Sequence, residues 1–107
     1  MRTILILDDD QAVRQSLADY FEDHLWYPLQ AESAEEALLV VDREIPVAAV
    51  VDVRLPGMDG GSFVDETIRR NVPIAIVMCT GSSDYRVSPE LLDHPRVARR
   101  SSPTLAG

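Results

Sequence analysis

Three short and mostly apolar runs punctuate the chain, at residues 2–7, 47–51 and 74–79. Each run is too short for a free-standing helix and is rich in Val, Ile or Leu, which is typical of a strand buried on both faces. A weaker segment at residues 26–31 also predicts a strand, and its Pro28 favours the edge of a sheet. The apolar pattern therefore predicts four strands.

A helical pattern separates the first strand from the segment at residues 26–31. Apolar residues recur there at spacings of three and four over residues 11 to about 25, which predicts one amphipathic helix. Asp10 is its expected N-cap, because a short acidic side chain can accept the unpaired N–H groups of the first turn. The expected apolar face consists of Val13, Leu17, Tyr20, Phe21 and Leu25.

Two further helices are expected between the later strands. Ser33 and Glu36 match a capping box, so a second helix begins there and ends before Pro46, which cannot continue it. A third amphipathic helix follows Gly60, which we interpret as a turn residue. Arginines at positions 69–70 suit its last turn, where the helix dipole favours cations.

Strands that alternate with helices at this short spacing predict a parallel sheet with right-handed crossovers. The expected fold class is α/β, a three-layer α-β-α sandwich with a central parallel sheet. At 107 residues, a single domain covering positions 1–107 is expected.

The pattern degrades after Thr80. Residues 88–92 can start only a short helix, and residues 96–107 resemble neither a buried strand nor an amphipathic helix. We therefore expect residues 83–107 to be a degenerate or disordered tail, with the C-terminal strand and helix degenerate or missing.

Composition narrows the range of functions. The formal net charge is −8, which argues against nonspecific nucleic-acid binding, because a phosphate backbone is bound by clustered cations. The lack of a long apolar run or leader predicts a soluble protein without membrane contact. The single cysteine, Cys79, is expected to be a core residue. One cysteine without a partner fits a reducing, cytoplasmic setting. All ten basic residues are Arg, so the chain contains no lysine.

Acidic residues follow the first strand in an unbroken triplet, Asp8, Asp9 and Asp10. Adjacent carboxylates repel one another unless something neutralises them. The dipole of the following helix accounts for Asp10 better than for all three. A divalent cation bound by some of the triplet is the alternative that we favour.

The other strands also end in polar residues. Asp52 closes the run at 47–51, and Thr80 follows the run at 74–79. The carboxyl ends of parallel strands share one edge of a sheet, where ligands bind, so Asp8, Asp9, Asp52 and Thr80 are expected to meet there. Carboxylate oxygens suit Mg²⁺, which keeps open positions for phosphate oxygens. This arrangement predicts phosphoryl transfer to an aspartate nucleophile.

These residues closely resemble the receiver domain of two-component response regulators, a flavodoxin-like domain that accepts phosphate from a histidine kinase. The resemblance rests on Asp8 and Asp9, on Asp52 and the residues after it, and on Thr80. The motif after Asp52 is Leu55-Pro56-Gly57-Met58-Asp59-Gly60. The resemblance covers residues 1 to about 82.

The resemblance implies a role for each matching residue. Asp52 would be the phosphoacceptor and Asp9 a direct Mg²⁺ ligand, with Asp8 binding directly or through water. Asp52 and the backbone carbonyl of Arg54 would complete the metal contacts of the protein. Thr80 would be the switch hydroxyl that moves toward the phosphoryl group.

The C-terminal part departs from the family pattern. Receivers usually carry a Lys-Pro dipeptide about twenty-two residues after the switch hydroxyl, and this chain has Ser102-Pro103 there. Arg99 and Arg100 are the nearby cations, and a guanidinium is a poor substitute for a compact ammonium. Without that lysine, the conformational output of phosphorylation would be weak or absent.

Two other functions stay open. A degenerate receiver can serve as a phosphorylation-independent protein-binding module. A haloacid-dehalogenase-like phosphatase would instead use Asp8 as nucleophile and Asp10 as general acid, although the lysine of that family is missing too.

The resemblance also implies partners. A sensor histidine kinase or a phosphotransfer protein would donate the phosphoryl group, and a downstream protein would read the output. Direct nucleic-acid binding and an enzymatic turnover of substrate are not expected. The basic tail can dock on the acidic body of a second copy, which would give a homodimer.

Overall fold

The computed structural model describes residues 2–52, 60–79 and 97–100. The strands are β1 (Arg2–Leu7), β2 (Trp26–Ala31), β3 (Ala48–Asp52), β4 (Ala75–Cys79) and β5 (Val97–Arg100). The helices are α1 (Gln11–Asp23), α2 (Ala34–Arg43) and α3 (Gly60–Arg69). None of the helices described is long and apolar enough to cross a membrane.

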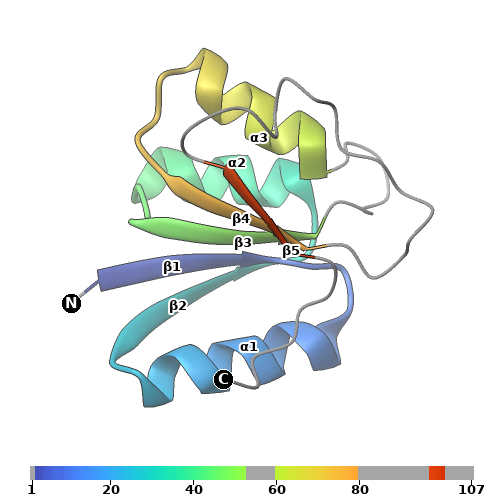
Figure 1. Ribbon diagram of the computed structural model, residues 1–107, viewed down its shortest axis with the longest axis vertical. Helices are drawn as coiled ribbons and strands as arrows, with labels where there is room; N and C mark the ends of the chain where they lie inside the picture. Colours follow the sequence, from blue (N-terminus) through green and yellow to red (C-terminus); the bar gives the residue numbers. More distant parts are fainter. Residues whose placement is uncertain (1, 53–59, 80–96, 101–107) are drawn as a thin grey trace.

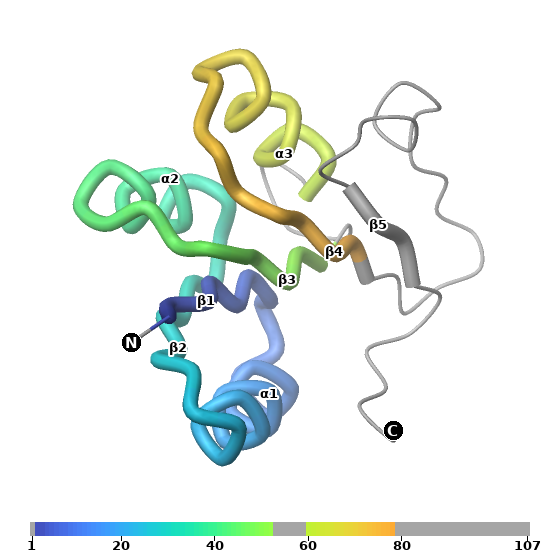
Figure 2. Tube along the Cα trace, turned by 60° about the vertical axis from the view of Figure 1, so that its left-hand side comes forward, coloured from blue at the N-terminus to red at the C-terminus, as the bar shows by residue number. Residues whose placement is uncertain are grey.

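All described strands run parallel in one sheet, in the order β2-β1-β3-β4-β5 (Figure 1). Helix α1 covers one face of the sheet, and α2 and α3 cover the other (Figure 2). The expected three-layer α-β-α sandwich is therefore confirmed. The position of β2 at an edge also agrees with the prediction from Pro28.

The strand order reverses beside β1. The chain moves from β1 outward to β2 and then returns to place β3 on the other side of β1. This reversal is a topological switch point, where the loops that follow the two inner strands diverge and leave a crevice for ligands. The site described below lies at that point.

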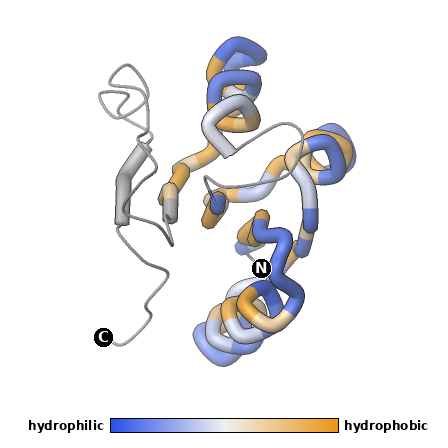
Figure 3. The backbone as a smooth tube through the Cα atoms, turned by 90° about the vertical axis from the view of Figure 1, so that its right-hand side faces the viewer, coloured by the Kyte–Doolittle hydropathy of each residue, from blue (hydrophilic) through white to orange (hydrophobic). Residues whose placement is uncertain are grey.

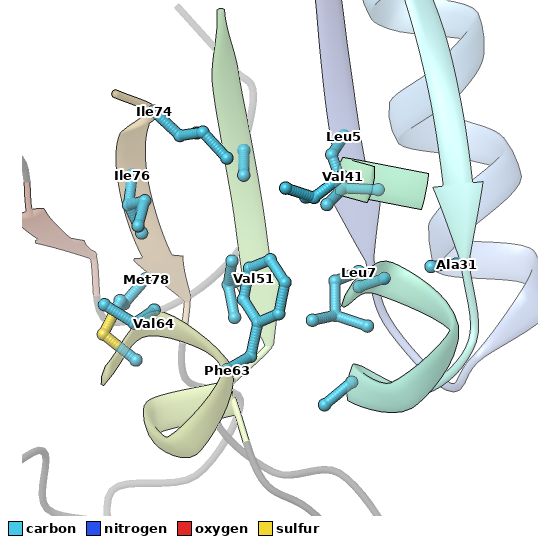
Figure 4. Close-up of a cluster of buried hydrophobic side chains, with 13 residues drawn as sticks. Leu5, Leu7, Ala31, Val41, Val51, Phe63, Val64, Ile74, Ile76 and Met78 are labelled. Atoms are coloured by element: carbon cyan, nitrogen blue, oxygen red, sulfur yellow. The ribbon is translucent and has the colours of Figure 1, made fainter. Parts of the chain in front are cut away.

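Buried side chains form one cluster on each face of the sheet. Along β1, Leu5 and Leu7 belong to one cluster and Ile4 and Ile6 to the other, as the alternation of a strand requires. Phe63 of α3 is fully buried on the face of the sheet that α2 and α3 cover (Figure 4). Each helix carries both hydrophobic and hydrophilic positions, as expected for helices that cover a sheet (Figure 3).

The helix boundaries follow their capping residues. The Asp10 side chain accepts the N–H groups of Ala12 and Val13, which confirms it as the N-cap of α1. The Ser33 hydroxyl accepts the Glu36 N–H at the start of α2, at 3.1 Å.

The expectation for Leu25 was wrong. Helix α1 ends at Asp23, and Leu25 has φ 67° and is 79% exposed, so it lies outside the apolar face. Its left-handed backbone turns the chain away from the helix axis and toward β2. Leu25 follows Phe21 at the spacing of a helix, but α1 ends before Leu25.

The expectation for residues 96–107 was wrong at positions 97–100. These residues form β5, which pairs with β4 from Ile76↔Val97 to Cys79↔Arg100. An outer strand is held by main-chain hydrogen bonds, which an apolar pattern does not report. The short helix expected at 88–92 and the Ser102-Pro103 dipeptide lie outside the described residues.

Candidate acidic site at the carboxyl edge of the sheet

The site is assembled by the pairing of β1 with β3. Leu7 of β1 is the register partner of Val51 of β3. The next residues, Asp8 and Asp52, therefore lie side by side where the two strands end. Both strands run in the same direction (Figure 1). Asp8 and Asp52 therefore lie at the same edge of the sheet. This edge is the switch point of the fold.

Three carboxylates converge there. Asp8, Asp9 and Asp52 each offer one ligand oxygen, and these oxygens all lie within 4.8 Å of one another. Hard oxygen donors at such separations suit Mg²⁺, which binds one or two carboxylates and keeps positions for other oxygen ligands. The residues present therefore fit a divalent cation, and the expected convergence of these three acids is confirmed.

Asp8 is buried and is held by several hydrogen bonds. The residue is only 9% exposed, and its carboxylate Oδ1 accepts the Asp10 N–H at 2.8 Å. Its own N–H donates to the Ala31 carbonyl of β2 at 3.1 Å. Its carbonyl accepts Nη1 of Arg14 at 2.8 Å. Two hydrogen bonds thus fix the main chain of Asp8, and a third orients its carboxylate.

The electrostatics of Asp8 oppose its ionised form. Burial raises the pKa of the Asp8 carboxyl, and the charges of Asp9 and Asp10 raise it further. The hydrogen bond from the Asp10 N–H and the charge of Arg14 lower that pKa, but the net direction is upward. A bound cation would offset both the burial and the repulsion.

The acidic triplet divides into two functions. Asp10 is exposed, and its carboxylate accepts the Ala12 N–H at 2.9 Å as the cap of α1. Asp9 is also exposed, but it belongs to the carboxylate cluster. The interpretation that Asp10 serves the helix and not the cation is supported by this geometry.

Arg14 and Gln30 were not singled out by the sequence pattern. The sequence pattern predicted only that Arg14 is a polar residue of α1 and that Gln30 lies in a strand. Their contacts depend on the packing of α1 beside β2, which spacing along the chain does not reveal. Thr80 and Arg54, two further predicted site residues, lie outside the described residues.

Comparison with known proteins places the chain among signalling domains. Residues 4–95 match the sequence model of a family described as the response regulator receiver domain. The positive alginate biosynthesis regulatory protein of Pseudomonas aeruginosa is 31% identical over 85 residues, which cover 77% of this chain and 34% of that protein. Sporulation initiation phosphotransferase F of Bacillus subtilis is 31% identical over 83 residues, which cover 76% of this chain and 67% of that protein.

Several curated relatives are much longer than this chain. The chain spans 34% of the alginate regulator and 36% of nodulation protein W of Bradyrhizobium diazoefficiens, which is 32% identical over 81 residues. The similarity thus concerns about a third of the length of these relatives.

Solved structures share the fold. The response regulator protein TrrA of Thermotoga maritima, crystallised in complex with Mg(2+)-BeF, has a TM-score of 0.81 at 24% identity, covering 94% of this chain and 88% of that one. A CheY-like receiver domain protein of Methanospirillum hungatei has a TM-score of 0.79 at 22% identity, covering 92% and 81%. At these identities the likeness concerns the fold alone.

Proposed function

This chain belongs to the response regulator receiver domain family, and from that premise we propose that Asp52 is its phosphoacceptor. The phosphoryl donor would be a histidine kinase or a phosphotransfer protein. The observation that carries the proposal is the convergence of Asp8, Asp9 and Asp52, with ligand oxygens within 4.8 Å of one another, at the switch point of the sheet.

The proposed reaction is an in-line displacement at phosphorus. A carboxylate oxygen of Asp52 forms the new O–P bond, the P–N bond of the phosphohistidine breaks, and the imidazole nitrogen keeps the electron pair. Asp8, Asp9 and Asp52 would hold Mg²⁺, which supplies charge neutralisation for the phosphoryl oxygens. The rigid hold on Asp8 supports this role, because a fixed ligand needs no reorganisation.

Two further roles rest on the resemblance alone. The backbone carbonyl of Arg54 would be a metal contact, and the Thr80 hydroxyl would bond a phosphoryl oxygen as the switch residue. In the register of β3 and β4, Asp52 is opposite Cys79, and Thr80 follows Cys79 in the sequence.

A phosphorylation-independent binding module is the second candidate. The observation in its favour is the complete lack of lysine, since the receiver pattern uses a lysine to pair with the phosphoryl group. In this case the output would be binding of a downstream protein or of a second copy, without a covalent change. The acidic net charge of −8 still disfavours direct nucleic-acid binding. The cytoplasmic setting stays a prediction in either case.

The phosphatase alternative loses its support. The family model that the chain matches is that of the receiver domain, which disfavours a phosphatase. In addition, the Asp10 carboxylate, which would be the general acid, accepts the N–H groups of Ala12 and Val13 as a helix cap. We therefore do not propose it further.

Intact mass spectrometry tests the proposal. The chain is incubated with Mg²⁺ and acetyl phosphate, beside Asp52→Asn and a sample with EDTA. Asp23→Asn is the matched control, because Asp23 is an exposed aspartate at the far end of α1. A labile phosphoryl adduct that needs Mg²⁺ and Asp52 but not Asp23 supports phosphoacceptance. No adduct, where an ordinary receiver is modified, supports the binding module, and an adduct that persists in Asp52→Asn contradicts the assignment.

A further inference from the structure

We propose that Arg14, acting with Gln30, is a positioning residue that sets the metal affinity of the acidic site. Arg14 would hold the turn of Asp8 and Asp9 in its ligating geometry without contacting the cation. The inference rests on the proposed function in that Mg²⁺ is taken as the ligand. It concerns two residues that lie outside the carboxylate cluster itself.

The guanidinium of Arg14 joins two elements. Its Nη1 donates to the Asp8 carbonyl at 2.8 Å, and its Nε donates to Oε1 of Gln30 on β2 at 3.2 Å. The planar fork of an arginine can make both bonds at once, whereas the single ammonium of a lysine cannot reproduce that geometry. Arg14 therefore clamps the end of β1 between α1 and β2.

This clamp acts on the backbone of Asp9 as well as on Asp8. The Asp8 carbonyl and the Asp9 N–H belong to one rigid peptide plane, so fixing the carbonyl also fixes the start of Asp9. The Asp8 N–H is held by the Ala31 carbonyl of β2 at 3.1 Å. Strand β2 thus orients the turn both directly, through Ala31, and indirectly, through Gln30 and Arg14.

A purely electrostatic role does not fit these contacts. Among the residues that the structure describes, Arg14 forms no ion pair, and its acceptors are a carbonyl and an amide oxygen. The charge of Arg14 repels a metal but also lowers the pKa of Asp8 and favours its ionised form, so the two electrostatic effects oppose each other. The benefit of Arg14 is therefore geometric, as with other outer partners that orient metal ligands.

Charge-neutral substitutions test this role. Arg14→Lys, Gln30→Ala and the double variant all keep the net charge. We expect Mg²⁺ binding, measured by calorimetry, to weaken by about tenfold in Arg14→Lys, within the range found for outer-shell partners, and by less in Gln30→Ala. The double variant should lose no more than Arg14→Lys alone, because both changes break the same link.

Amide hydrogen exchange gives a readout that needs no metal. The Asp8 and Asp10 N–H groups donate to Ala31 and to the Asp8 carboxylate. In metal-free protein, both should exchange faster in Arg14→Lys and in Gln30→Ala than in the wild type. The matched controls are Arg43→Lys on the exposed last turn of α2 and Gln15→Ala on the exposed face of α1. Neither control should change the exchange of these amides.

Arg14→Met separates geometry from charge. Positioning predicts weaker Mg²⁺ binding even though a repelling cation has been removed, so tighter binding overturns the proposal. Equal affinity and exchange in Arg14→Lys and Arg43→Lys overturn it too. If Arg14→Lys fails to fold, Gln30→Ala, an exposed position on an edge strand, decides the outcome. A wild type that binds no Mg²⁺ refutes the proposed function, while unchanged amide exchange in the variants refutes the clamp.

Discussion

Gly60 lies directly against the main-chain carbonyl of Asp52. A Cβ built on Gly60 would stand 2.8 Å from the carbonyl carbon of Asp52 and 2.9 Å from Cγ1 of Val51, and closer still to the carbonyl oxygen. Backbone atoms cannot yield as the end of a flexible side chain can. Helix α3 can therefore begin flush against the proposed phosphoacceptor because position 60 has no side chain.

Gly60→Ala is expected to disturb both stability and phosphoryl acceptance. The added methyl group must push either α3 or the Asp52 peptide aside, at a cost of about 1–3 kcal/mol in the free energy of unfolding. Urea unfolding measures the stability, and the rate of adduct formation with acetyl phosphate measures the site. We expect a rate at least severalfold below that of the wild type.

Val64→Ala is the matched control for Gly60→Ala. Val64 is fully buried in the same helix, so its truncation also destabilises α3. The close contact with Asp52 is left intact. Equal adduct rates in the two folded variants would mean that Gly60 serves stability only.

Mg²⁺ should raise the stability of the folded chain. A ligand that binds only the native state adds about 2.7 kcal/mol at a free concentration of 100 times its Kd. We expect a concentration-dependent rise in Tm that Asp9→Asn reduces strongly, because Asp9 belongs to the carboxylate cluster. Asp19→Asn, at an exposed position on α1, is the control. An equal rise in Tm in both variants would mean that Asp9 does not bind the cation.

The stability of the metal-free protein should fall as the pH rises through the pKa of Asp8. Burial raises that pKa in the folded state above the ordinary value of 3.8. The unfolded chain therefore gives up this proton more readily, and the stabilising contribution, complete below pH 3.8, is lost as the pH rises through the folded pKa.

Asp8→Asn checks this pH dependence. Asparagine keeps an oxygen acceptor for the Asp10 N–H but carries no charge. At neutral pH and without metal, we expect it to be more stable than the wild type by on the order of 1 kcal/mol, because the burial of a charge and its repulsion by Asp9 and Asp10 are removed. Thermal unfolding in EDTA measures the difference, and a less stable Asp8→Asn would contradict the prediction. In excess Mg²⁺ the order should reverse.

The ion pairs of α3 should give the opposite pH response. Hydrogen bonds from Arg69 and Arg70 lower the pKa of Glu66, so their contribution is present above the unfolded pKa of 4.5 and is lost as the pH falls through the folded value. Arg70 also reaches Asp42 of α2 at 3.3 Å. Glu66→Gln should make the free energy of unfolding depend less on pH in this acidic range. High salt should shrink the effect, since Arg69 and Arg70 are exposed.

The inner strands and the acids at their ends were predictable from the sequence. Strands β1, β3 and β4 lie in the interior of a parallel sheet, and burial on both faces demands a continuous apolar run. Because β1 and β3 are parallel, Asp8 and Asp52 at their carboxyl ends must lie at the same edge of the sheet. Composition and order along the chain were sufficient for this part of the site.

The missed features depend on contacts that no local pattern encodes. β5 is joined to the sheet through main-chain pairing with β4. Leu25 matches the helical spacing, but the helix ends before it. Arg14 finds its acceptors on Asp8 and Gln30, which come together only when α1 packs beside β2.

The placement of β1 between β2 and β3 also orders events during synthesis. Once residues 1–31 have left the ribosome, β1 and β2 can already pair, α1 can pack on them, and the bonds of Arg14 to Asp8 and Gln30 can form. The carboxylate cluster still lacks Asp52, which is added only with β3. We therefore expect the growing chain on the ribosome to prepare one half of the site early and to remain without its full cation affinity until β3 docks beside β1.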